Sequence, residues 1–95
     1  MNNIPHVFML WVLLMNNLKM LTRLEVSELL NTHIDTVSML SELKILKPIK
    51  IGKCYMFSQD NIQRFQHDYE GLDLSNKLKA LEAKRIVEAR FNEQH

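Results

Sequence analysis

The chain has 95 residues, of which 46% are hydrophobic and 24% are charged, and its 12 Lys and Arg nearly balance its 11 Asp and Glu. This length indicates one small domain with a thin core and little room for a deep catalytic cleft, so we expect a binding module rather than an enzyme. The single cysteine excludes an intramolecular disulfide framework and a cysteine-based zinc cluster, and it fits a cytoplasmic protein.

An apolar segment, residues 1–17, opens the chain. Its uncharged run from Val7 to Met15 predicts a helix that is apolar on all sides. The run is shorter than the roughly 18 residues of a membrane span and lacks the basic start of a secretory signal, so we expect no membrane contact. Two placements stay open: the helix packs on the domain core, or it docks into a partner protein or a second copy of the chain. In the second placement the contact residues are Phe8, Leu10, Trp11 and Leu14.

A helix pair is predicted at the start of the next region, residues 18–71. Thr22 and Glu25 have the spacing of a capping box, which predicts a helix that begins there and ends near Asn31. A second helix begins at residues 33–35 and repeats apolar residues every three positions. Two short helices joined by about three residues form a helix-turn-helix.

A β-hairpin is predicted after this helix pair. The β-rich runs Pro48–Ile51 and Cys54–Phe57 flank Gly52 and Lys53, where glycine supplies the positive φ of a type II′ turn. Residues 18–21 are a candidate third strand beside this hairpin.

Two more helices are predicted in the rest of the chain. Ser58 caps the first, which closes with Gly71 in the C′ position. Residues 72–95 predict a charged helix capped by Ser75 that runs to Asn92. We expect Leu74, Leu78 and Leu81 to dock on the domain and the end of the helix to project. This end is either frayed or held by a partner, which it would contact through Val87 and Phe91.

The order of these elements resembles a known family. Residues that carry the resemblance are Leu21-Thr22, Glu25-Val26, Glu28-Leu29-Leu30, Thr36-Val37, Ile51-Gly52-Lys53, Tyr55, Phe57-Ser58, Ile62 and Phe65. Their arrangement is similar to the winged helix-turn-helix of the excisionase and AlpA-type DNA-binding domains, relatives of the MerR regulators. The resemblance implies a mainly α fold with a small β-hairpin wing, here with an apolar N-terminal helix and a charged C-terminal helix. It also implies a small phage or mobile-element protein that binds DNA without catalysis.

Charge is distributed unevenly along this region. Leu24 to Leu43 contains four acids and no Lys or Arg, whereas Lys44 to Lys53 contains four lysines and no acid. A duplex attracts the lysines and repels the acids. Three interpretations follow: the wing binds DNA while the second helix reads few bases; the side of the second helix that carries Met39 contacts a protein; or the lysines are only solvated. In the first, the DNA contacts are Thr32, His33, Thr36, Ser38, Lys47, Lys50, Lys53 and Tyr55.

No motif indicates catalysis. The four histidines lack metal-ligand spacing, so we expect no metal, no cofactor and no small-molecule substrate. The predicted function is non-catalytic DNA binding. The alternative is a small accessory subunit that binds a larger mobile-element replication or recombination enzyme, such as a polymerase or primase, and helps it engage nucleic acid.

Overall fold

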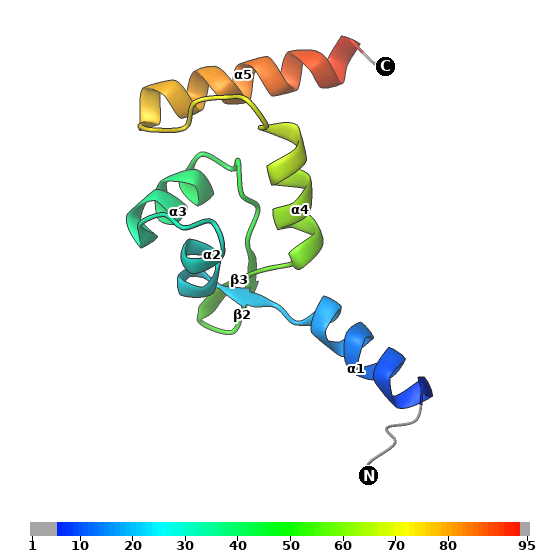
Figure 1. Ribbon diagram of the computed structural model, residues 1–95. Helices are drawn as coiled ribbons and strands as arrows, with labels where there is room; N and C mark the ends of the chain where they lie inside the picture. Colours follow the sequence, from blue (N-terminus) through cyan, green and yellow to red (C-terminus); the bar gives the residue numbers. More distant parts are fainter. Residues whose placement is uncertain (1–5, 94–95) are drawn as a thin grey trace.

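The computed structural model describes residues 6–93, except for the side chains of His6 and Leu14, and this part of the chain is mainly helical with a small antiparallel sheet. In chain order the elements are α1 (His6–Leu18), β1 (Leu21–Thr22), α2 (Arg23–Leu29), α3 (Ile34–Glu42), β2 (Ile49–Ile51), β3 (Cys54–Phe57), α4 (Gln59–Asp68) and α5 (Lys77–Glu93). The molecule measures 55 × 33 × 25 Å, because α1 extends from one end and α5 lies across the opposite end (Figure 1).

Two of the predicted helix starts are confirmed by their hydrogen bonds. The Glu25 backbone N–H donates to Thr22 Oγ1 at 3.1 Å, and the Thr22 backbone N–H donates to Glu25 Oε1 at 3.0 Å, which completes the capping box of α2. At the start of α4, Ser58 Oγ accepts from the Asn61 backbone N–H at 3.0 Å.

Both helices of the α2–α3 pair end in the same way. Asn31 follows the C-cap of α2 with φ 54°, as predicted, and the next N–H, that of Thr32, donates to the Ser27 carbonyl at 2.9 Å. Lys44 follows the C-cap of α3 with φ 60°, and the Ile45 N–H donates to the Leu40 carbonyl at 2.9 Å. These are Schellman motifs. The second was not predicted, because lysine carries no bias toward positive φ.

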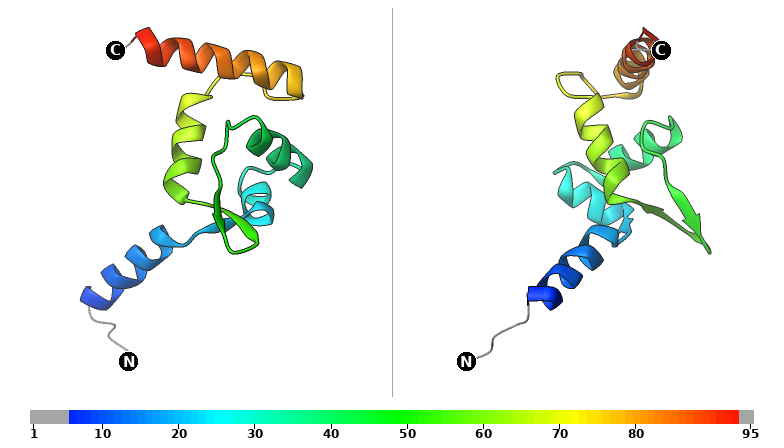
Figure 2. Two further views of the ribbon diagram at one scale, coloured as in Figure 1. Left: turned by 180° about the vertical axis from the view of Figure 1, so that it is seen from behind. Right: turned by 90° about the vertical axis from the view of Figure 1, so that its right-hand side faces the viewer.

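The three strands form a sheet in the order β1-β3-β2. Ile51 pairs with Cys54 across the two-residue turn, where Gly52 has φ 64° and Lys53 is not among the described residues with positive φ. This agrees with the type II′ turn expected from the sequence. The predicted third strand, residues 18–21, is confirmed only at Leu21. The observed strand β1 continues to Thr22, and both of its residues pair with β3. The β2–β3 hairpin reaches beyond the helices (Figure 2).

The core lies where α2, α3, α4, α5 and β3 meet. Its buried members are Val26, Val37, Leu40, Ile45, Leu46, Phe57, Ile62 and Ala80. Met39 and Leu43 are partly buried against this cluster. Part of the side of α3 that carries Met39 is therefore used inside the domain. Its contact with another protein stays a prediction.

The segment between α4 and α5 corrects two predicted boundaries. Tyr69 is the C-cap of α4, so Gly71 lies one position beyond C′; its φ of 82° serves a turn in which the Leu72 N–H donates to the Tyr69 carbonyl at 3.1 Å. Helix α5 is capped by Asn76, whose Oδ1 accepts from the Lys79 N–H at 2.9 Å. Ser75 lies one position before this cap, and its own N–H and hydroxyl donate to Asp73 Oδ1.

Helix α5 docks through alanines and not through leucines. Ala80 and Ala83 are 0% and 3% exposed, whereas Leu78 is 80% exposed and Leu81 is also exposed. Residues two positions apart lie about 200° apart around a helix, so burial of Ala80 turns Leu78 toward solvent. The expected docking of Leu78 and Leu81 is therefore wrong, whereas Leu74 packs on the core as expected.

Helix α1 does not pack on the core, so the first of its two expected placements is wrong. Trp11 is 57% exposed, and Phe8, which lies 6.4 Å from it between ring centroids, is also exposed. The other exposed large apolar side chains of α1 are Val7, Met9, Leu10, Leu13, Met15 and Leu18. Residues 1–5 and the side chain of Leu14, an expected contact residue, lie outside the described part of the chain.

Candidate nucleic-acid interface

A pocket of about 340 Å³ lies between α3 and the β2–β3 hairpin. Its lining comes from the start of α2, one face of α3, and the face of β3 that also supplies Phe57 to the core. The lining residues are Arg23, Ser38, Ser41, Glu42, Pro48, Tyr55 and Phe57. The pocket therefore combines an aromatic and apolar floor with cationic, hydroxyl and carboxylate groups.

Arg23 is the cation of this pocket. It occupies the first position of α2, directly after the Thr22 cap, and its Nη1 donates to Ser38 Oγ on α3 at 2.9 Å. Its other guanidinium N–H groups make no hydrogen bond in the described part of the chain. Sequence reasoning missed Arg23 because the acidic stretch was counted from Leu24. The sequence does contain a signal for it: the Thr22–Glu25 capping box places Arg23 in the exposed first turn of α2.

Tyr55 lines the pocket from the hairpin, and Lys50 lies beside its ring. They are partners in the β2–β3 register, so their side chains lie on the same face, and Lys50 Nζ is 5.8 Å from the centroid of the Tyr55 ring. This is a cation–π contact. Lys53 is exposed in the turn at the tip of the same hairpin.

The four lysines between positions 44 and 53 do not form one surface. Lys44 and Lys47 line a different groove, between the end of α4 and α5, together with Lys84, Val87 and Phe91. Only Lys50 and Lys53 belong to the hairpin. The expected basic patch of the wing is therefore smaller than the sequence run suggests, because the chain turns between Lys47 and Lys50.

The candidate residues of the α2–α3 pair are likewise divided. Ser38 lines the α3–hairpin pocket, but Thr36, two positions earlier, lies about 200° away around the helix and is not part of the lining. Thr32 is half-buried in the turn before α3. His33 is the N-cap of α3, and its Nδ1 accepts from the Asp35 N–H at 3.1 Å. The structure thus places Ser38 and Tyr55 in one pocket, with Lys50 beside Tyr55. It leaves Thr32, His33, Thr36 and Lys47 elsewhere.

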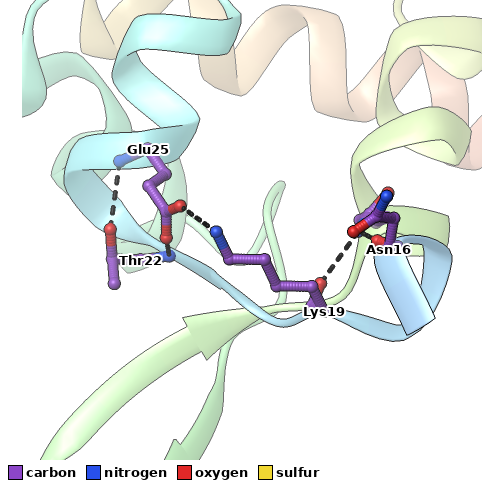
Figure 3. Close-up of polar contacts among 5 residues, drawn as sticks. Asn16, Lys19, Thr22 and Glu25 are labelled. Carbon is purple, nitrogen blue, oxygen red and sulfur yellow. Dashed lines mark hydrogen bonds and ion pairs between the residues drawn. The ribbon is translucent and has the colours of Figure 1, made fainter. Parts of the chain in front are cut away.

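A polar joint connects α1 to the rest of the molecule (Figure 3). Lys19 Nζ lies 3.0 Å from Glu25 Oε2, so the glutamate of the capping box also holds the segment that follows α1. Gln59 Nε2 donates to the carbonyls of Lys19, at 3.0 Å, and Asn16. The Thr22 backbone N–H and the Lys19 ammonium lower the pKa of the Glu25 carboxyl below its ordinary value of 4.5. Helix α1 is therefore held at its C-terminal end while its apolar surface stays uncovered.

Comparison of the chain with protein-family models, with curated proteins and with solved structures finds no match. Among the described residues, no three His, Cys, Asp or Glu side chains are grouped closely enough to hold a metal ion. Within the same residues, no helix has both the length and the apolar character needed to cross a membrane.

Proposed function

We propose that this chain is a non-catalytic DNA-binding protein of the winged helix-turn-helix type, similar to the excisionases of phages and mobile elements. In this proposal α2 and α3 are the helix-turn-helix and the β2–β3 hairpin is the wing. The observation that carries it is that Arg23 and Tyr55 line one pocket between α3 and the hairpin, with Lys50 beside the exposed Tyr55 ring. DNA is the expected partner, in the cytoplasm.

The electrostatics favour approach through the hairpin. Each phosphate that a Lys or Arg neutralises releases counterions and adds to affinity. Arg23, Lys50 and Lys53 supply three cations on this side of the molecule, whereas Asp35 and Glu42 are exposed acids of α3. Binding should therefore be modest, salt-sensitive and centred on the hairpin and the start of α2.

The test is charge reversal on the hairpin. Lys50→Glu together with Lys53→Glu should weaken DNA binding by on the order of tenfold or more at about 0.1 M salt, with little change in melting temperature. Fluorescence anisotropy with a labelled duplex measures this. The matched control, Lys77→Glu with Arg90→Glu, makes the same charge change on α5 and should bind DNA nearly as the parent does. Equal losses in both variants would contradict the proposed surface.

A second candidate function is favoured by the exposed surface of α1: an accessory subunit that binds a larger replication or recombination enzyme. A helix that is apolar on all sides is stable only when other surfaces cover it. Trp11 and Phe8 are the side chains expected to dominate such a contact, since buried aromatics are frequent hot spots.

Phe8→Ala with Trp11→Ala tests this candidate. The double variant should lose a tight, salt-resistant complex with a larger polymerase, primase or recombinase, while its thermal unfolding stays close to that of the parent. Leu24→Ala with Leu29→Ala is the control, because these exposed leucines lie on α2. Such a complex, together with weak and salt-sensitive binding of the free chain to DNA, would favour the accessory function over the autonomous one.

A further inference from the structure

We propose that Arg23 and Glu42 together read one G·C base pair in the major groove, with the guanidinium on guanine and the carboxylate on cytosine. This inference rests on the proposed DNA-binding function. It assigns a base-reading role to two residues on different helices that line the same pocket.

A surface that only binds phosphates does not explain why the acidic residue Glu42 lies in this pocket. Glu42 lines the pocket and is exposed, and it makes no hydrogen bond or ion pair within the described part of the chain. A carboxylate directed toward a phosphate would be repelled. A carboxylate directed toward a base edge can accept a hydrogen bond from the N4 amino group of cytosine, which the major groove presents.

Arg23 has the complementary chemistry and is held in place. Ser38 Oγ accepts from Nη1 at 2.9 Å, and Nε and Nη2 make no hydrogen bond in the described part of the chain. Two N–H groups in a fixed plane match O6 and N7 of guanine, which is the commonest specific contact in protein–DNA complexes. The contact with Ser38 fixes the direction of the guanidinium before DNA binds.

The two side chains match one base pair when they act together. A G·C pair offers two acceptors on guanine and one donor on cytosine along its major-groove edge, and the pocket offers two donors from Arg23 and an acceptor from Glu42. Arg23 and Glu42 form no ion pair with each other, although both line the pocket. Both are therefore available to a ligand placed between them.

The experiment selects duplexes from a randomised library with the full chain and then measures anisotropy on the selected duplex. We expect the parent chain to prefer G·C over A·T at one position by between about fivefold and 150-fold. Arg23→Ala and Glu42→Ala should each reduce that preference to below about twofold at the same position. Glu42→Ala should at the same time bind unselected DNA at least as tightly as the parent, because it removes a negative charge.

Matched controls are Arg64→Ala and Glu28→Ala, which remove the same charges from exposed sites on α4 and α2 and should keep the preference. Circular dichroism of each variant checks folding. The two test variants lie on different helices, so one folded variant is sufficient.

Two outcomes would overturn the inference and leave the proposed function standing: a parent chain that binds DNA without base preference, or an Arg23→Ala variant that binds all sequences more weakly by the same factor. Absence of any DNA binding at low salt would overturn both.

Discussion

Helices α1 and α5 stand at opposite ends of the molecule and differ in how they use their apolar side chains (Figure 1). Between positions 7 and 18, α1 has no charged residue, yet its large apolar side chains are mostly exposed. Helix α5 alternates acidic and basic residues, yet it is anchored in the core by Ala80. Hydrophobicity along the sequence therefore does not determine which terminal helix packs on the domain.

The two helices differ in burial because only α5 has a face of small side chains that can come close to the core. An alanine face lets the backbone of α5 come close to the core, and the long charged side chains stay in solvent. Helix α1 has bulky side chains on every face, and they meet no complementary surface in the part of the chain that the structure describes. The two helices share one feature, a polar joint where each connects to the rest of the chain: Lys19 with Glu25 after α1, and Asp73 with Ser75 and Lys79 at the start of α5.

The largest effect expected from this comparison concerns Ala80. Ala80→Leu inserts three carbon atoms into a fully buried contact and should lower the free energy of unfolding by about 1–3 kcal/mol through overpacking. Leu78→Ala on the opposite face should change it by less than about 0.5 kcal/mol, because Leu78 is exposed. Urea denaturation of both variants measures the difference. Equal effects would mean that α5 does not dock through its alanine face.

Local hydrogen-bonding signals explain the part of the fold that the sequence predicts well. The Thr22–Glu25 box, the Ser58 cap, Asn31 at positive φ and Gly52 in the hairpin turn each depend on a few neighbouring residues. Residues close together in the sequence determine such caps and turns, so they can be predicted without knowing how distant segments pack. They locate the helix pair, the hairpin and the helix after it.

Several failures lie where distant segments must meet. Leucine spacing predicted docking of Leu78, but close approach of two elements selected the alanines. One failure is local: the cap of α5 is Asn76 and not Ser75, which instead donates to Asp73. In the candidate site, Lys47 and Lys50 are near in sequence but serve different surfaces, whereas Arg23 and Ser38 are fifteen positions apart and share a hydrogen bond.

A smaller effect is expected at the joint of α1. Gln59→Ala removes the donor that bridges the carbonyls of Asn16 and Lys19, and hydrogen bonds of this kind contribute about 1 kcal/mol or less at exposed sites. Amide hydrogen exchange in the last turn of α1 should become faster, while exchange in α5 stays unchanged. Gln63→Ala, one turn further along α4, is the control. Faster exchange in both terminal helices would show that the joint is not local to α1.

The smallest expected effect is a pH dependence of the stability of the polar joint at the start of α5. The Ser75 hydroxyl, the Ser75 N–H and the Lys79 ammonium hold the pKa of Asp73 at about 2, below its ordinary value of 3.8. Because this pKa is depressed in the folded chain, the stabilisation is present above about pH 4 and is lost as the pH falls toward 2.

Asp73→Asn sharpens this prediction, because the amide oxygen can still accept from Ser75 but cannot ionise. Amide exchange in the first turn of α5 should therefore rise between about pH 4 and pH 2 in the parent chain and depend less on pH in the variant. The Glu25 carboxyl, whose pKa is also lowered, makes the joint of α1 weaken on acidification in the same sense. Direct titration of the carboxyl resonances separates the two joints, and an Asp73 resonance that titrates near pH 4 would show that its contacts with Ser75 and Lys79 do not persist in solution.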